Sequence, residues 1–121
     1  MKISSGIDII EIKRIKEAVE KYEGKFKEEI FTIREIEYCE SHNLQKYQHY
    51  AARFAAKEAI FKAISNKLNR NYSWNDFEIV NNKIGKPEVY LKNEIKEIES
   101  IDISISHCKE YAVANAVVLF K

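Results

Sequence analysis

The chain has 121 residues, and its hydrophobic share of 45% is enough for the core of one ordinary domain. Lys and Arg number 20 against 19 Asp and Glu, so the weak overall field gives no general reason to expect nucleic-acid binding. Charges interrupt nearly every block of ten residues, and no stretch approaches the ~20 apolar residues that a membrane helix requires. We expect a single domain over residues 1–121, without a membrane span or a nucleic-acid partner.

The N-terminal segment and the cysteines favour a cytoplasmic protein. Asp8 and Glu11 follow Lys2 within a few residues, and the apolar core of a secretion signal would not contain them. Cys39 and Cys108 lie far apart, in no spacing typical of a zinc site or a redox pair. We therefore expect two reduced thiols.

The first third of the chain predicts a strand followed by two helices. Residues 2–9 are rich in β-branched side chains and predict a strand that ends near Asp8. The next segment has an apolar side and a basic side at helical spacing, with Ile12, Ile15, Val19 and Tyr22 on the first and Lys13, Arg14, Lys16 and Lys21 on the second. Gly24 ends this helix. Thr32 and Glu35 have the spacing of a capping box, and Ile33, Ile36 and Cys39 continue a second helix until residues 41–43.

A third helix is predicted over residues 45–66, and its residue types sort by face at 100° per residue. One narrow sector holds four methyl-sized side chains, which would let another backbone approach closely: Ala52, Ala56, Ala59 and Ala63. A sector nearly opposite sets charged groups among aromatic rings: Phe54, Glu58, Phe61, Lys62 and Ser65. A charge among aromatic side chains indicates a missing partner.

The last part of the chain reads mainly as strands. Residues 77–80 and 88–91 predict a hairpin joined through residues 81–87, and a short helix is expected around residues 94–98. Residues 102–106 alternate, with Ile101, Ile103 and Ile105 on one face. Residues 111–120 are apolar on both faces apart from Asn115, which places this strand inside the sheet or at a subunit contact. The class is α+β: a small, mainly antiparallel sheet packed against a long central helix and shorter helices.

Asp8 and Glu58 suggest a magnesium site. Mg²⁺ is commonly held by one or two carboxylates together with substrate phosphates, so two acids suffice when a diphosphate completes the octahedron. Two local roles fit the same spacings. Asp8 with Glu11 could cap the first helix, and Glu58 with Lys62 could form an i,i+4 surface ion pair.

Several cations could hold phosphate groups. Arg53, Lys57 and Lys62 lie on the third helix, and Lys67 and Arg70 follow it. Such a set could clamp a polyphosphate and stabilise charge on a leaving phosphate, or it could be a solvated helix flank. His107, at the end of the polar strand edge, could donate to a phosphate or occupy a turn.

Three motifs, in order, resemble those of the holo-acyl-carrier-protein synthases. The first is the N-terminal segment Gly6-Ile7-Asp8-Ile9-Ile10-Glu11-Ile12. The second is the helix Ala52-Arg53-Phe54-Ala55-Ala56-Lys57-Glu58-Ala59-Ile60-Phe61-Lys62-Ala63, and the third is the late strand Ser104-Ile105-Ser106-His107. The length, the strand entry at residues 74–79 and the turn at residues 85–87 also agree. The family's glycine-rich loop after the helix is replaced here by residues 64–73, where Lys67 and Arg70 could supply charge instead.

The resemblance implies a homotrimer with active sites at its interfaces, in fatty acid biosynthesis. It implies coenzyme A as the donor, an apo acyl carrier protein as the acceptor and Mg²⁺ as the cofactor. Asp8 and Glu58 would hold the metal and Lys62 would lie against the pyrophosphate. Arg53, Ser106 and His107 match positions that line the nucleotide, with His107 at the 3′-phosphate. Arg14 matches a position that pairs with an acidic helix of the carrier protein.

These roles predict a phosphoryl transfer. The serine hydroxyl of the carrier attacks the β-phosphate of coenzyme A in line and expels 3′,5′-ADP, while Asp8, Glu58 and Lys62 act at the reacting phosphates. Glu58 accepts the serine proton, directly or through water.

Two rival classes make different predictions. A coenzyme A or nucleotide sensor would bind its ligand without magnesium and would not need Asp8 and Glu58. A nucleic-acid binder using the basic first helix would lose affinity steeply with salt.

Overall fold

The computed structural model describes residues 2–22 and 24–121, and these form an α+β fold. The elements run in the order β1 (Lys2–Glu11), α1 (Ile12–Lys21), α2 (Lys25–Ile30), α3 (Ile33–Glu40), a 3₁₀ turn (Asn43–Gln45), α4 (Lys46–Ser65), a 3₁₀ turn (Trp74–Asp76), β2 (Phe77–Asn81), β3 (Pro87–Leu91), β4 (Ile98–His107) and β5 (Tyr111–Phe120). The expected class, the capping box of Thr32 and Glu35 and the long central helix are all confirmed.

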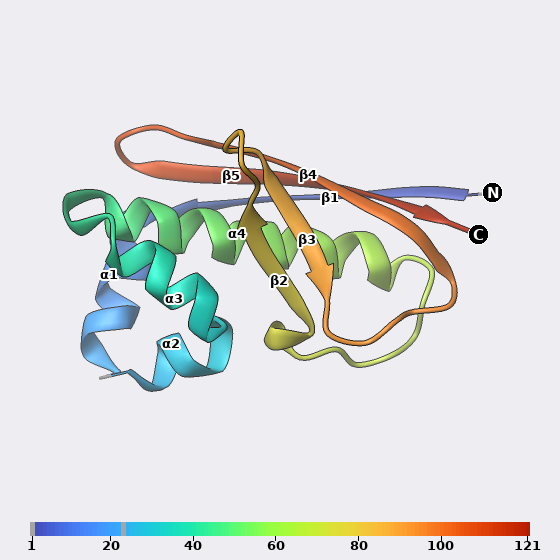
Figure 1. The fold of residues 1–121 in the computed structure, drawn as a ribbon, viewed down its shortest axis with the longest axis horizontal. Coiled ribbons are helices and arrows are strands. Elements are labelled where there is room, and N and C mark those ends of the chain that lie inside the picture. The colour runs from blue at the N-terminus through green and yellow to red at the C-terminus, as the bar shows by residue number, and fades with distance from the viewer. Residues whose placement is uncertain (1, 23) are drawn as a thin grey trace.

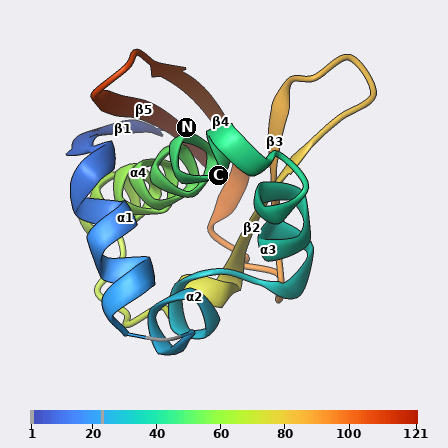
Figure 2. The same ribbon diagram turned by 90° about the vertical axis from the view of Figure 1, so that its left-hand side faces the viewer.

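The long strands make a three-stranded antiparallel sheet in the order β1-β5-β4, and β2 and β3 form a separate hairpin. Figure 1 shows α4 lying along one face of the larger sheet, with the short helices on the other side of α4 and the β2–β3 hairpin crossing in front of it. Seen along its axis in Figure 2, α4 has β1 and β5 on one side and α1, α2 and α3 around the rest. The last strand is central, as its apolar sequence predicts.

Two hydrophobic clusters meet on α4. One joins α4 to β2, β4 and β5, and the other joins it to the short helices. The stripe of Ala52, Ala56, Ala59 and Ala63 is buried, whereas Phe54, Glu58, Phe61, Lys62 and Ser65 are half-buried or exposed. The two sectors expected from the sequence are therefore both present.

The structure differs from the expectations in three places. β1 continues to Glu11 rather than ending near Asp8, because each of its residues through Glu11 pairs with β5. The helix α2 is not predicted by the sequence, because six residues are too few to show a helical repeat of apolar side chains. The predicted helix around residues 94–98 is wrong: the Ile98 amide donates to the Ile95 carbonyl in a turn, and Ile98 then begins β4.

Strand β1 reverses the usual burial pattern. Its small residues Ser4 and Gly6 face the interior, while Ile3, Ile7 and Ile9 are 69%, 62% and 63% exposed. The inner face has no room for larger side chains because α4 lies so close. The outer face of the three-stranded sheet is left uncovered, and its β1 side is apolar.

Among the residues that the structure describes, no helix is long and apolar enough to cross a bilayer. The two cysteines are free thiols, Cys39 buried and Cys108 exposed, as expected. Burial raises the pKa of the Cys39 thiol to about 12, so this thiol is unreactive.

Candidate active site

The candidate site begins where β1 crosses α4. A Cβ added to Gly6 would overlap the carbonyl oxygen of Ala59 and would lie 2.8 Å from the backbone nitrogen of Ala63. Strand and helix are thus in backbone contact, which only glycine on one side and the alanine stripe on the other allow. This contact brings Asp8, two residues after Gly6, to the face of α4 that carries Glu58 and Lys62.

Asp8 and Lys62 form an ion pair across this crossing. The Lys62 ammonium donates to Asp8 Oδ1 at 3.1 Å and to the Ile7 carbonyl at 2.9 Å. The Asp8 side chain is only 17% exposed, whereas that of Lys62 is 54% exposed. Lys62 therefore pairs with Asp8 across the fold rather than with Glu58 along the helix. The Glu11 side chain makes no capping bond to α1. The two local roles considered above, a helix cap by Asp8 and Glu11 and an ion pair between Glu58 and Lys62, are therefore both wrong.

Glu58 lies within range of the charges of Asp8 and Lys62. Burial raises the pKa of the Glu58 carboxyl, the charge of Asp8 raises it further, and Lys62 lowers it. Like charges held close together favour a cation between them. Within the described residues, no group of three or more His, Cys, Asp or Glu side chains could hold a metal. Two carboxylates are the donor set that suits Mg²⁺ when substrate phosphates supply further oxygens.

A second polar group surrounds the N-terminal half of α4. The ring of His49 lies 4.3 Å from that of His42 and 6.5 Å from that of His107, measured between centroids. The Arg53 guanidinium stacks 4.1 Å from the centre of the Tyr38 ring and donates to Asn81 Oδ1 at 2.8 Å. Arg53 is buried, and its Nε has no partner in the structure. The chain's three histidines and a buried arginine thus gather at one place.

This cluster predicts that the protein is less stable in acid. Burial is the main cause that lowers the pKa of His49 from 6.5 to about 4, followed by the charges of His42, Arg53 and His107. Between these two pH values the unfolded chain takes up a proton that the native state does not, so the free energy of unfolding falls on acidification. His49→Phe is expected to remove this contribution. The check is the Tm of both proteins at pH 7 and pH 5, and an equal loss of Tm in both would contradict it.

The two groups are distinct within one chain. Arg53 and Glu58 are five residues apart on α4, which is about 7.5 Å along the axis at ~1.5 Å per residue. Ser106 pairs with Val113, and both side chains lie on the outer face of the sheet, opposite to the face that carries Asp8. Arg14 is exposed on α1 beside Lys13. The structure therefore brings Asp8, Glu58 and Lys62 together and Arg53 and His107 together, but leaves Ser106 and Arg14 apart from both.

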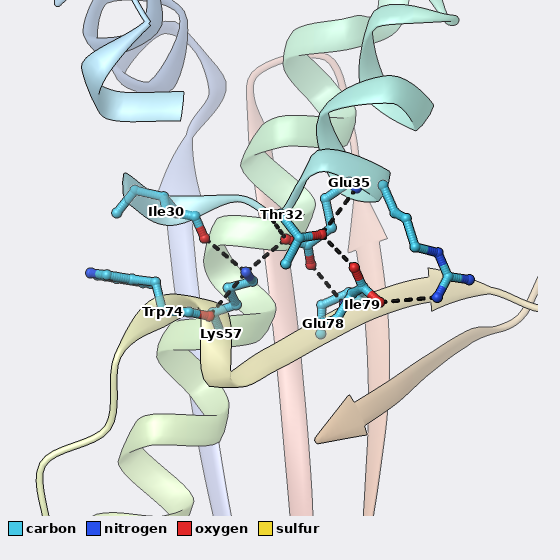
Figure 3. Close-up of polar contacts among 8 residues, drawn as sticks. Ile30, Thr32, Glu35, Lys57, Trp74, Glu78 and Ile79 are labelled. Carbon is cyan, nitrogen blue, oxygen red and sulfur yellow. Dashed lines mark hydrogen bonds and ion pairs between the residues drawn. The ribbon is translucent and has the colours of Figure 1, made fainter. Parts of the chain in front are cut away.

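The anion clamp suggested for Lys57 is wrong. This lysine is fully buried, and its ammonium donates to the Ile30 carbonyl, Glu35 Oε1 and the Trp74 carbonyl at 2.7, 2.7 and 3.0 Å (Figure 3). All three of its hydrogens are used inside the protein. Arg70 pairs with Glu97, so it too has an internal partner.

Aromatic side chains flank Glu58. Trp74 packs edge-on against Phe54 and Phe61, with centroids 5.2 and 5.0 Å apart. These two phenylalanines lie four residues before and three residues after Glu58, on the same face of α4. Sequence reasoning placed the phenylalanines on this face but missed Trp74, because only the folded chain brings the 3₁₀ turn against α4.

Comparison with known proteins identifies the class of this fold and site. Residues 4–116 match the family model described as the 4′-phosphopantetheinyl transferase superfamily. The chain is 48% identical to the holo-[acyl-carrier-protein] synthase of Ruminiclostridium cellulolyticum, over 98% of this chain and 92% of that protein. This chain therefore belongs to the 4′-phosphopantetheinyl transferase superfamily and, within it, to the holo-[acyl-carrier-protein] synthases.

Solved structures agree in fold. The Helicobacter pylori holo-[acyl-carrier-protein] synthase in complex with coenzyme A matches with a TM-score of 0.84 and 33% identity, over 95% of this chain and 99% of that one. The Bacillus anthracis synthase in complex with CoA (3′,5′-ADP) matches with a TM-score of 0.79 and 36% identity, over 95% and 94%. The family resemblance and the fold expected from it are confirmed.

Proposed function

We propose that this chain, as one domain of residues 1–121, transfers 4′-phosphopantetheine from coenzyme A to a serine of an apo acyl carrier protein and releases 3′,5′-ADP. Membership in the synthase family supports the reaction, and the complexes of two relatives with coenzyme A or its nucleotide support the donor. The observation that carries the proposal here is the meeting of Asp8, Glu58 and Lys62 at the crossing of β1 and α4.

In this proposal Asp8 and Glu58 hold Mg²⁺. The cation, when bound, neutralises charge at the entering and leaving oxygens of the reacting phosphate. Lys62 has a flexible, half-exposed side chain at the same place and stabilises the negative charge that develops on the departing 3′,5′-ADP. The oxygen of the carrier serine forms the new bond to phosphorus as the bond to 3′,5′-ADP breaks. Glu58 takes the serine proton, directly or through a water molecule.

The cluster around Arg53 suits the nucleotide end of the donor. Arg53 and His107 are nitrogen donors, and phosphate groups bind charged donors strongly. The unpartnered Nε of Arg53 is a hydrogen-bond donor that a buried site would be expected to satisfy. Arg14, exposed on the basic side of α1, is assigned to the acidic carrier protein by charge complementarity.

The decisive experiment is a mass measurement. The protein is incubated with apo acyl carrier protein, coenzyme A and Mg²⁺, and the carrier is weighed by mass spectrometry. The proposal predicts a mass increase equal to one phosphopantetheine group, and the same reaction with EDTA gives none. Coenzyme A binding without any change in the carrier's mass would instead favour the sensor.

We also propose a homotrimer with active sites at its interfaces, in the cytoplasm and in fatty acid biosynthesis. A large exposed apolar face marks an interaction surface, and the outer sheet face presents Ile3, Ile7 and Ile9 to solvent. Ser106 lies on this same outer face. Because it faces away from Asp8 of its own chain, we propose that it contacts the nucleotide bound by a neighbouring copy.

Ile7→Lys is therefore expected to produce monomers, because a buried and unpaired ammonium would oppose assembly. Ile33→Lys is the matched control: Ile33 is 74% exposed on α3, away from the sheet, and its replacement should leave assembly intact. Sedimentation measures the mass of each protein. A monomeric parent protein would contradict the proposed trimer, and an Ile7→Lys variant that stays assembled would contradict the interface assigned to the outer sheet face.

A further inference from the structure

The Lys57 network joins four parts of the chain around the helix that carries Glu58. From α4, the ammonium reaches the end of α2 at Ile30, the start of α3 at Glu35 and the 3₁₀ turn at Trp74. Figure 3 shows the three acceptors converging on the lysine. Each of its hydrogens has one acceptor, so the side chain has a single satisfied arrangement.

Glu35 completes the network, and both of its carboxylate oxygens accept hydrogen bonds. Its Oε1 accepts from the Thr32 amide at 2.8 Å as well as from Lys57, and its Oε2 accepts from the Ile79 amide at 2.7 Å. Its side chain, like that of Lys57, is 0% exposed. The Lys57 ammonium is fully buried and all of its hydrogens are used, so Lys57 does not bind substrate.

A buried ion pair of this kind is weak evidence for stability. Desolvation of the two charges offsets most of their attraction, and apolar replacements of such pairs are often neutral. What this pair does provide is a fixed geometry, because it ties the backbone at Trp74 to α4. The ring of Trp74 then lies against Phe54 and Phe61, on either side of Glu58 along the helix.

We propose that Lys57 is a positioning residue, which fixes the backbone at Trp74 and through the Trp74 ring holds the aromatic surroundings of Glu58 in place. Lys57 acts through Trp74 and touches no substrate. Without the tether the 3₁₀ turn can shift, the ring leaves the two phenylalanines, and the face that carries Glu58 loses its packing. The kinetic part of this inference rests on the proposed function, but its structural part does not.

The test uses a matched pair of variants. Lys57→Met alone would leave the Glu35 carboxylate buried and unpaired and would disrupt the fold. The informative comparison is Glu35→Gln against Glu35→Gln with Lys57→Met. In Glu35→Gln the ammonium loses its counter-charge but keeps three acceptors, the carbonyls of Ile30 and Trp74 and the new amide oxygen, so the tether to Trp74 remains. Both carry the same amide opposite the Ile79 N–H, and they differ in the ammonium tether. Both are studied well below their melting temperatures, with circular dichroism as the check on folding.

Fluorescence gives a readout that needs no activity. Trp74 is the only tryptophan in the chain, so its emission and its quenching by acrylamide report on this ring alone. The double variant is expected to show stronger quenching than Glu35→Gln. Unchanged quenching would overturn the proposal. A double variant that does not fold would also overturn it, because the tether would then hold the chain together rather than place the ring.

Kinetics separate positioning from mere destabilisation. The double variant should lose up to about 100-fold in kcat relative to Glu35→Gln, the scale of an ångström-sized misplacement, with little change in KM for the carrier protein. Adding Trp74→Leu to the double variant should cost little more, although Trp74→Leu alone lowers kcat. Additive losses would show that Lys57 does not act through Trp74. If the parent protein transfers nothing, the proposed function fails, and the quenching comparison still decides the role of Lys57.

Discussion

Replacing Asp8 or Glu58 by alanine is expected to lower kcat for phosphopantetheine transfer by at least about 10²–10³-fold, the usual loss when a group that stabilises transition-state charge is removed. Each replacement takes away half of the carboxylate pair that holds the cation. Neither should unfold the protein. Asp8 pairs with a half-exposed lysine, and such pairs contribute little stability, about 0–1 kcal/mol. Glu58 is half-buried within α4, where alanine is a favourable helix residue.

The control for these variants is Glu11→Ala. Glu11 is an exposed acid at the end of the same strand, and its side chain makes no cap to α1. Its replacement should leave kcat unchanged. Steady-state rates are measured with excess Mg²⁺, so that a merely weakened site is refilled. Full activity of Asp8→Ala or Glu58→Ala under these conditions would remove the proposed metal site.

Gly6→Ala is expected to be strongly destabilising although it adds a single methyl group. Ordinary overpacking of a core costs about 1–3 kcal/mol, and the loss here should exceed that range because the obstructing atoms belong to the backbone of α4. Strand β1 would have to move away from the helix, which separates Asp8 from Glu58. The variant should therefore lose both stability and transfer activity.

Ser5→Ala is the matched control, since Ser5 is the next residue of β1 and points to the exposed outer face. Its free energy of unfolding should stay close to that of the parent. Urea denaturation of both variants provides the comparison. A Gly6→Ala protein as stable as Ser5→Ala would show that β1 and α4 are not in backbone contact.

Much of the fold could be predicted from the sequence because its signals are local and periodic. The alanine stripe at every third or fourth residue predicted a close approach to α4, and the structure places Gly6 against it. The capping box at Thr32 and Glu35 fixed the start of α3. The five-residue helix expected around residues 94–98 failed because Ile95 and Ile98, three residues apart, fit a turn before a strand as well as a helix.

The site could be predicted only in part. Asp8 and Glu58 are fifty positions apart, and the family resemblance rather than their spacing brought them together. The role of Lys57 could not be predicted, because a lysine between Ala56 and Glu58 on a helix is usually a surface residue and its three acceptors come from three other segments. Nor does the sequence show that His42, His49 and His107 gather, since the last of them lies on a distant strand.

The most direct measurement is calorimetric titration of Mg²⁺ into the protein in the presence of coenzyme A. If residues 8 and 58 hold the ion beside the diphosphate, the parent protein should bind one Mg²⁺ per coenzyme A site, and Asp8→Ala and Glu58→Ala should each abolish that heat. Equal Mg²⁺ binding by all three proteins would mean that the ion, if the reaction uses one, is held elsewhere.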